Sequence, residues 1–186
     1  IRPKPVLFIT VGLVGTGKTV LAQALAKRLG TVVISSDVTR KQLADILPTE
    51  HRFAEFGAGI YTREFSRLTY DTMFAEARRY LSAGSSVILD ASFIKAEERQ
   101  KTKNLAQETN ADFFILECTL DKNQIKQRLK RRLEEGTVSD GRWEIFESQK
   151  KIFEPVVEVP PQNHVIIDAS NPVNENIEQI LDKIGE

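Results

Sequence analysis

A glycine-rich segment near the start of the chain has the residue types and the spacing of a phosphate-binding site. Residues 12–19 read Gly-Leu-Val-Gly-Thr-Gly-Lys-Thr and directly follow an apolar run at residues 6–11. Glycines let the backbone turn sharply and point consecutive N–H groups at phosphate oxygens, while the following helix presents its positive end. Lys18 is then placed to hold the outer phosphates, and the Thr19 hydroxyl to bind Mg²⁺. The pattern predicts a Walker A loop that binds ATP with Mg²⁺, rather than an ordinary glycine turn.

The residues expected to contact the nucleotide lie within residues 12–20, and Leu13 is the one residue of this stretch that is not among them. They are Gly12, Val14, Gly15, Thr16, Gly17, Lys18, Thr19 and Val20.

A carboxylate at the end of another apolar run is the candidate metal partner. Residues 86–90 read Ser-Val-Ile-Leu-Asp, an apolar strand closed by an aspartate, as in a Walker B motif. Asp90 would act on Mg²⁺ directly or through its waters. The alternative is a strand-end carboxylate that caps the next helix. Given the phosphate loop, we favour the metal role and predict Thr19 and Asp90 as the metal-binding residues.

A second acid and an arginine follow the apolar run at residues 32–34. Asp37 ends the predicted strand, and Arg40 comes one helical turn later, so both side chains can face the same cleft. A carboxylate there can accept the proton of an acceptor hydroxyl while the arginine orients that acceptor. The alternative is that Asp37 is the N-cap of the next helix, a duty that Ser36 could share. We favour the catalytic role.

A run of cations at residues 126–132 predicts a basic helix followed by a loop at residues 136–141. We expect a lid over about residues 122–142, whose arginines stabilise phosphate charge on closure. The candidates are Arg128, Arg131 and Arg132. The alternative is a solvated face on which Glu134 and Glu135 pair with basic residues one turn away.

Strands and helices alternate along the chain, which predicts an α/β domain with a parallel sheet covered on both faces and ligands beyond the carboxyl ends of the strands. The predicted strands are at residues 6–11, 32–34, 86–90, 113–118 and 165–168. The predicted helices are at residues 18–29, 38–47, 61–83, 95–109, 122–135 and 173–184, with a loop at 49–59.

Length and composition fit a single domain over residues 1–186. The chain has 26 basic and 26 acidic residues, which gives no global charge drive toward nucleic acid or an anionic membrane. Its single cysteine, Cys118, lies in an apolar run and is expected to be buried. Because no stretch has the length of a membrane span and no secretion signal is present, we expect a cytoplasmic protein without membrane contact. The start at Ile1 suggests a domain excised from a longer chain.

The whole chain resembles the P-loop kinases, and most closely the AAA_33-type ATP-binding module that is related to the kinase domain of polynucleotide 5′-kinases. The resemblance rests on residues 12–19, the Ser36-Asp37-x-x-Arg40 segment, the Leu89-Asp90-Ala91-Ser92 strand end with Glu97-Glu98-Arg99 beyond it, and the basic helix. It implies a three-layer P-loop NTPase fold with a five-stranded parallel sheet, the loop strand at its centre, and a helical lid. It also implies a fused N-terminal domain as a partner, because a similar module occurs behind aminoglycoside-phosphotransferase-like domains.

The same resemblance assigns roles to individual residues. Asp37 would be the general base, Arg40 an acceptor-binding arginine, and Asp90 and Ser92 residues of the site. The expected activity is transfer of the γ-phosphate to an acceptor hydroxyl. Phosphorylation of an unspecified hydroxyl ranks first, and the neutral charge balance favours a small acceptor. A nucleic-acid 5′-hydroxyl ranks second, and for it a channel could be lined by Arg40, Arg52, Arg63 and Arg67. A regulatory ATP-binding or ATPase module of a larger protein is the third reading.

Overall fold

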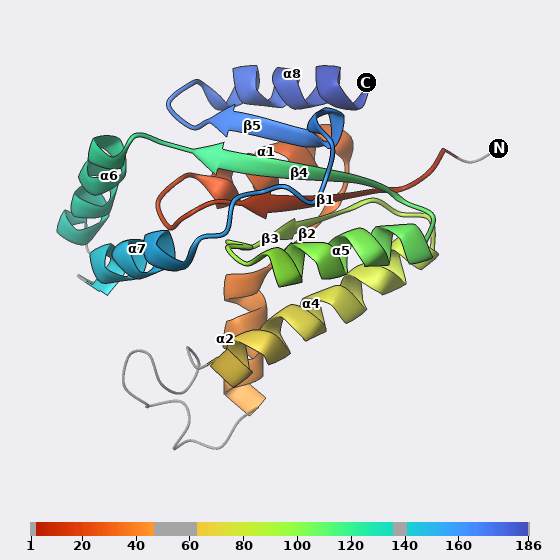
Figure 1. Ribbon diagram of the computed structural model, residues 1–186, viewed down its shortest axis with the longest axis horizontal. Coiled ribbons are helices and arrows are strands. Elements are labelled where there is room, and N and C mark those ends of the chain that lie inside the picture. The colour runs from red at the N-terminus through yellow and green to blue at the C-terminus, as the bar shows by residue number, and fades with distance from the viewer. Residues whose placement is uncertain (1–2, 47–62, 136–140, 186) are drawn as a thin grey trace.

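Five strands form one parallel sheet with the strand of the phosphate loop at its centre. The computed structural model describes residues 3–46, 63–135 and 141–185. The strands are β1 (Val6–Val11), β2 (Val32–Ser35), β3 (Val87–Asp90), β4 (Asp112–Thr119) and β5 (His164–Asp168). They lie in the order β2-β3-β1-β4-β5, and every neighbouring pair is parallel. All five carboxyl ends therefore meet at one edge of the sheet, on the left in Figure 1.

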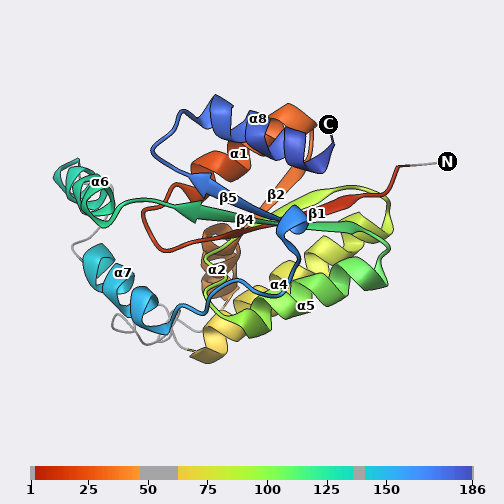
Figure 2. The ribbon, with the colours of Figure 1, turned by 45° about the horizontal axis from the view of Figure 1, so that its top comes forward.

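Helices cover both faces of this sheet and extend past its carboxyl edge. They are α1 (Lys18–Leu29), α2 (Ser36–Ile46), α4 (Arg63–Ser82), α5 (Ala96–Glu108), α6 (Lys122–Glu134), α7 (Gly141–Ile152) and α8 (Val173–Ile184). In Figures 1 and 2, α1 and α8 lie on one face, α4 and α5 on the other, and α6 and α7 beyond the carboxyl edge. The structure thus confirms the predicted three-layer α/β fold.

The sheet separates two apolar clusters, and the alternation of side chains along β1 supplies both. Leu7 and Ile9 point into the cluster beneath α4 and α5, together with Met73 and Leu105. Phe8 points into the opposite cluster, which α1 and α8 complete. A third cluster joins Val14 of the phosphate loop to Ile125, Leu129 and Phe146 of α6 and α7. The core therefore continues from the sheet into the helices that border the loop.

Two features of the fold differ from the sequence prediction. The segment after residue 142 carries a helix, α7, and a short 3₁₀ turn at Pro161–Asn163, neither of which was predicted. Helix α2 begins at Ser36 rather than at residue 38, so Asp37 lies in its first turn. The predicted loop at 49–59 and Arg52 lie outside the described residues, as do residues 136–140 of the predicted lid.

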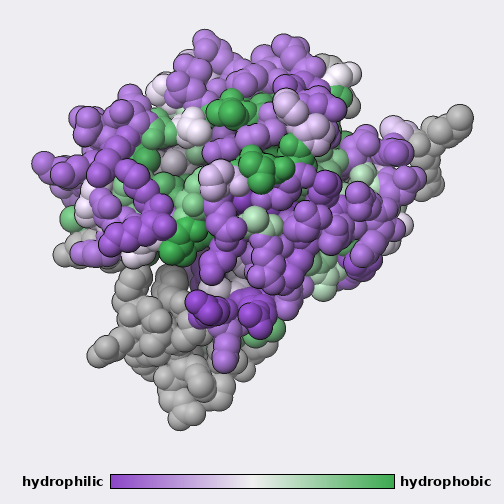
Figure 3. Space-filling view, viewed as in Figure 1, coloured by the Kyte–Doolittle hydropathy of each residue, from purple (hydrophilic) through white to green (hydrophobic). Residues whose placement is uncertain are grey.

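Hydrophilic residues cover most of the face drawn in Figure 3, and hydrophobic residues form small separate groups on it. The exposed apolar side chains include Val157 and Ile166. Across the ranges that the structure describes, no helix combines the length and apolar character needed to cross a bilayer.

A buried arginine fastens the connection between α7 and β5 to the sheet. The guanidinium of Arg99, which is 0% exposed, pairs with Glu158 at 2.9 Å. It also donates hydrogen bonds to the carbonyls of Phe93 at 2.7 Å, Glu154 at 2.8 Å and Pro155 at 3.1 Å. Burying a charge is tolerated when it is paired and fully hydrogen-bonded. Arg99 therefore holds the turn after β3 and the residue 154–158 segment in fixed positions relative to α5.

We expect Arg99→Met to lower the free energy of unfolding by about 3–5 kcal/mol, because it leaves the Glu158 carboxylate buried without its partner. Urea unfolding measures this loss. Arg78→Met is the matched control: the Arg78–Glu108 pair joins α4 to α5 on the surface, and its loss should cost about 1 kcal/mol or less. Equal losses in the two variants would contradict the role given to Arg99.

Cys118 is buried at 3% exposure, as predicted, and desolvation raises the pKa of its thiol to about 12. At pH 8 only about one molecule in ten thousand then carries the reactive thiolate. We expect a thiol reagent to leave the native protein unlabelled over the time in which it fully labels the guanidinium-unfolded chain. Rapid labelling of the native chain would show that the strand end at Cys118 opens.

Candidate active site

A polar cavity of about 320 Å³ lies at the carboxyl edge of the sheet and brings most of the predicted site residues together. Its walls come from the phosphate loop, the end of β3, α2, α4 and the helix pair α6 and α7. Among its lining residues are Gly15, Gly17, Lys18, Thr19, Val20, Asp37, Arg40, Ser66, Asp90, Ser92, Arg132 and Gln149. Residues distant in the sequence are neighbours here because parallel strands end at the same edge.

Internal contacts hold the phosphate loop in shape. The Thr16 hydroxyl donates to the Leu13 carbonyl at 2.6 Å, and Lys18 Nζ donates to the same carbonyl at 2.8 Å. The Val14 N–H donates to Gln149 Oε1 at 2.8 Å. The loop leads into α1 at Lys18, so the positive end of that helix opens into the cavity.

Gly12 occupies a tight turn at the start of the loop and does not line the polar cavity. Its N–H bonds the Ser92 carbonyl at 3.0 Å. A Cβ atom at this position would lie 2.8 Å from the Cys118 carbonyl oxygen, closer than real Cβ contacts allow. Gly12 lines neither the polar cavity nor the cavity beside it. Gly12 is therefore fitted to the turn that leaves β1, and its contact with the nucleotide stays a prediction.

The two predicted metal ligands lie in direct contact. Thr19 Oγ1 donates to Asp90 Oδ2 at 2.8 Å, across 71 residues of sequence. Asp90 is 4% exposed, and this burial raises its pKa, although the Thr19 hydrogen bond and nearby Lys18 act in the opposite direction. Helix α5 begins at Ala96 with Lys95 as its N-cap, so Asp90 does not cap it. This excludes the alternative considered from the sequence.

The donor set of this pair fits Mg²⁺. The ion takes oxygen ligands, and it commonly binds through one or two protein groups plus waters and phosphates. A hydroxyl and a buried carboxylate supply such ligands, and the positive ion would offset the desolvation that raises the pKa of Asp90. In residues 3–46, 63–135 and 141–185, no group of three or more His, Cys, Asp or Glu side chains could hold a metal ion.

Asp37 and Arg40 line the same cavity from α2. Ser35 Oγ accepts a hydrogen bond from the Val38 N–H at 3.4 Å, so Ser35 rather than Asp37 provides the side-chain cap of α2. The exposed Asp37 carboxylate lies in the first turn of that helix. Arg40 Nη2 donates to Ser66 Oγ at 3.5 Å, which links α2 to α4. The geometry leaves the base role of Asp37 as a prediction, and it removes the capping role that competed with it.

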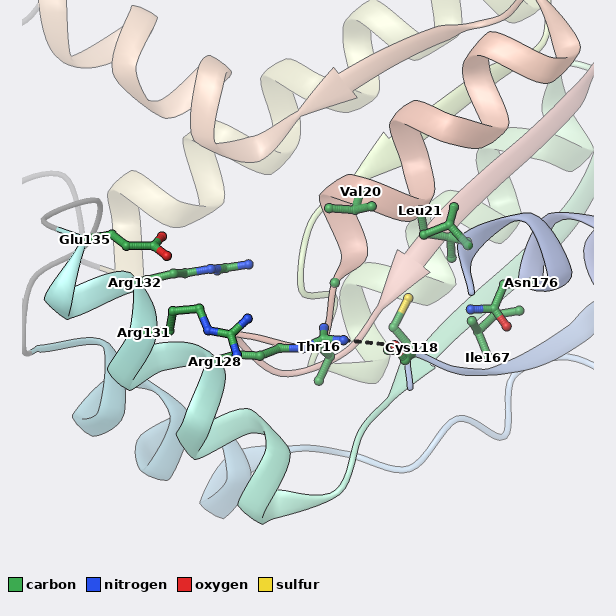
Figure 4. A pocket seen from close by; sticks show the side chains of 13 residues that line it. Thr16, Val20, Leu21, Cys118, Arg128, Arg131, Arg132, Glu135, Ile167 and Asn176 are labelled. Atoms are coloured by element: carbon green, nitrogen blue, oxygen red, sulfur yellow. Dashed lines mark hydrogen bonds between the residues drawn. The ribbon is translucent and has the colours of Figure 1, made fainter. Parts of the chain in front are cut away.

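The three predicted lid arginines border two cavities. Arg132 lines both the polar cavity and an adjacent one, which also has a volume of about 320 Å³, whereas Arg128 and Arg131 line only the adjacent one. This second cavity lies between α6, the phosphate loop and the turn from β5 to α8 (Figure 4). Arg128 Nη2 donates to the Ala169 carbonyl of that turn at 3.0 Å. The basic helix thus borders both cavities, and each arginine has a different position.

The predicted lid is incomplete without α7. Phe146 and Trp143 pack face to face, and Phe146 joins Ile125 and Leu129 against Val14. The predicted lid ended at residue 142, but α7 continues to Ile152 and brings Gln149 to the loop. The helical spacing of Trp143 and Phe146, together with that of Ile145 and Ile152, is the signal that could have revealed this helix.

Comparison with known proteins finds a matching family and curated relatives. The AAA_33 family, described as an AAA domain, matches residues 7–156. Uncharacterized protein Rv2004c from Mycobacterium tuberculosis is 30% identical over 139 residues, which are 75% of this chain and 28% of that protein. The match therefore spans little more than a quarter of the length of this curated relative.

Two solved structures share the fold at low sequence identity. A sugar kinase from Janibacter superposes with a TM-score of 0.70 at 20% identity, covering 98% of this chain and 95% of that one. The Mycobacterium tuberculosis APS kinase CysC in complex with AMPPNP and APS gives a TM-score of 0.67 at 17% identity, covering all of both chains. Together with the family match, these likenesses show that the chain belongs to the AAA_33 family and has the fold of a P-loop kinase module.

Proposed function

We propose that this chain transfers the γ-phosphate of ATP to a hydroxyl group of a small polar acceptor. The observation that carries the proposal is that one cavity contains Lys18, the Thr19–Asp90 pair, and Asp37 with Arg40. Groups suited to phosphate and metal and groups suited to an alcohol thus line the same cavity. This is the combination that phosphoryl transfer to an alcohol requires.

The residues have complementary roles in the proposed reaction. Lys18 and the loop N–H groups hold the outer phosphates, and Arg132 stabilises charge on the transferred group. Asp37 accepts the proton of the acceptor hydroxyl while the oxygen of that hydroxyl bonds to the γ-phosphorus. The bond from that phosphorus to the β–γ bridging oxygen breaks, and ADP leaves. Thr19 and Asp90 would hold Mg²⁺, which would supply positive charge to offset that of the phosphates.

The second cavity is the proposed place of the nucleotide base. It adjoins the phosphate loop at Thr16 and Gly17 and has an apolar wall that includes Leu21, Ile167 and Val173. Arg128 and Arg131 border it from α6 and can cover a planar ring. The solved APS kinase holds the ATP analogue AMPPNP, which supports a nucleotide in a fold of this kind.

The cavity residues beyond the phosphate loop favour a small-molecule acceptor over a polynucleotide. Beyond the phosphate loop, the lining residues that the structure describes include several serines together with Asp37 and Arg40, and none of them is aromatic. Single-stranded nucleic acids are usually bound by aromatic stacking platforms in a basic groove. Structural neighbours named as a sugar kinase, an APS kinase and a gluconokinase also point to small acceptors.

Radiolabelled γ-phosphate distinguishes the three readings. ATP and Mg²⁺ are supplied with either a panel of sugars, aminoglycosides and other small alcohols or with 5′-hydroxyl oligonucleotides. Label in the small-molecule pool supports the proposal, and label in the oligonucleotides overturns it in favour of a polynucleotide kinase. Release of free phosphate alone, with ATP binding demonstrated by calorimetry, would favour a regulatory ATPase.

Asp37→Asn should lower kcat about 10²- to 10⁴-fold while ATP affinity stays within a few fold, because the amide cannot accept the acceptor's proton. Steady-state kinetics and calorimetric titration with an ATP analogue measure the two quantities. Asp45→Asn changes an exposed acid two turns further along the same helix and serves as the control. Unchanged kcat in Asp37→Asn would remove the proposed general base.

Lys18→Ala should weaken ATP binding or transfer about 10- to 100-fold, because a charge-assisted contact to the phosphates is lost. Lys27→Ala removes an exposed ammonium from the last turn of the same helix and should leave both properties unchanged. Calorimetry and initial rates compare the two variants. Wild-type behaviour in Lys18→Ala would refute the placement of the phosphates in the loop.

A further inference from the structure

The side chain of Gln149 joins three separately built parts of the polar cavity. Its Oε1 atom accepts a hydrogen bond from the Val14 N–H of the phosphate loop at 2.8 Å. Its Nε2 atom lies 3.4 Å from Ser92 Oγ, in the turn after β3, and donates to it. Gln149 itself belongs to α7. One amide therefore connects the helix pair at the carboxyl edge to the phosphate loop and to the residue that follows the predicted metal ligand by two positions.

The backbone around Ser92 is held on every side. The Thr10 hydroxyl accepts from the Ala91 N–H at 3.0 Å and donates to the Ala91 carbonyl at 2.7 Å. The Ser92 carbonyl accepts the Gly12 N–H at 3.0 Å. Tyr70 Oη accepts the Phe93 N–H at 3.2 Å. Because these contacts fix the backbone, the side-chain rotation of Ser92 is the freedom that remains, and Gln149 contacts the hydroxyl that this rotation moves.

The same turn contains an unusual backbone conformation. Phe93 has a φ of 45°, in the left-handed region that bulky side chains rarely adopt. Such a conformation is unfavourable and persists where the surroundings over-determine it, often at functional sites. Phe93 is fully buried, with its ring packed edge-on against Tyr70. The turn is therefore stabilised by its neighbours in a shape that places Ser92 on the cavity wall.

Gln149 lies next to the apolar cluster that packs α7 against the phosphate loop. One turn earlier in α7, Phe146 packs with Val14, Ile125 and Leu129, so the helix cannot shift without disturbing the loop. A buried Val14 N–H would lack a partner if the glutamine were replaced by an apolar side chain. The two hydrogen bonds of Gln149 thus add polar contacts to the apolar packing between α7 and the loop. They lie at the cavity rather than in the core.

On the basis of the proposed function, we propose that Gln149 is a positioning residue for phosphoryl transfer. It fixes the first half of the phosphate loop through Val14 and sets the orientation of the Ser92 hydroxyl beside Asp90. The reacting phosphoryl group and the acceptor meet in this cavity, so both contacts order groups that surround the reacting atoms. Gln149 acts through Val14 and Ser92, and it need not touch either substrate.

Gln149→Met tests this proposal because it preserves the length and volume of the side chain but removes both hydrogen bonds. We expect kcat to fall about 10- to 100-fold, the scale of a small misplacement in an ordered site, with KM for ATP changed less than about threefold. Ser148→Ala, an exposed change at the adjacent position of α7, should leave kcat unchanged. Equal kcat in Gln149→Met and Ser148→Ala would overturn the proposal.

A double-mutant cycle tests the connection to Ser92. If Gln149 acts partly by orienting the Ser92 hydroxyl, Ser92→Ala combined with Gln149→Met should lose less activity than the product of the two single losses. Fully multiplicative losses would overturn this connection. A purely structural role would instead lower the urea midpoint of Gln149→Met without changing kcat.

Amide hydrogen exchange separates failure of this inference from failure of the proposed function. In Gln149→Met, exchange of the Val14 amide, followed by NMR on the full chain, should accelerate about tenfold because its hydrogen-bond acceptor is lost. Unchanged exchange would overturn the Gln149 contact whatever the activity. Absence of phosphate transfer by the wild-type chain to every acceptor would instead overturn the proposed function.

Discussion

The pairing of β1 with β3 is the constraint on which the rest of the site depends. In this register Ile9 lies opposite Leu89, and the chain beyond each strand leads to one member of the Thr19–Asp90 pair. Thr10, buried between the strands, bonds both backbone groups of Ala91 and fixes the point at which β3 ends. A shift of one residue would turn the alternating side chains of β1 to the wrong faces and separate the two oxygens. The contact between Thr19 and Asp90 is thus a consequence of sheet register.

Charges of both signs line the cavity. Its cations are Lys18, Arg40 and Arg132, and its carboxylates are Asp37 and Asp90. Desolvation raises the pKa of Asp90, and Lys18 counteracts part of this effect. The carboxylate therefore occupies a place where positive charge is favourable, which is the electrostatic condition for binding a cation together with a polyphosphate.

Much of the fold could be predicted because it follows from local patterns. The order of apolar runs and helical segments gave the parallel sheet, and the glycine spacing gave the loop and the start of α1 at Lys18. The neighbourhood of Thr19 and Asp90 was also predictable, since parallel strands end at one edge. By contrast, the capping of α2 depends on where the helix begins to within two residues, a precision that propensities do not provide.

The remaining details depend on how helices are rotated against the loop. Arg128 and Arg132 are one turn apart on α6, yet one bonds the Ala169 carbonyl and the other lines the polar cavity. Their difference arises from the packing of Ile125 and Leu129, which sets the rotation of the helix. Gln149 carries no motif, and its place at the loop follows from a helix whose few apolar residues give a weak periodic signal.

The contact between Lys18 and the Leu13 carbonyl has a consequence for the thermodynamics of ligand binding. This hydrogen bond, together with that of the Thr16 hydroxyl, closes the loop on itself at a single carbonyl oxygen. The loop is thus preorganised, and an arriving anion exchanges one acceptor for another instead of ordering a disordered segment. Less conformational entropy is therefore lost when an anion binds than a disordered loop would lose.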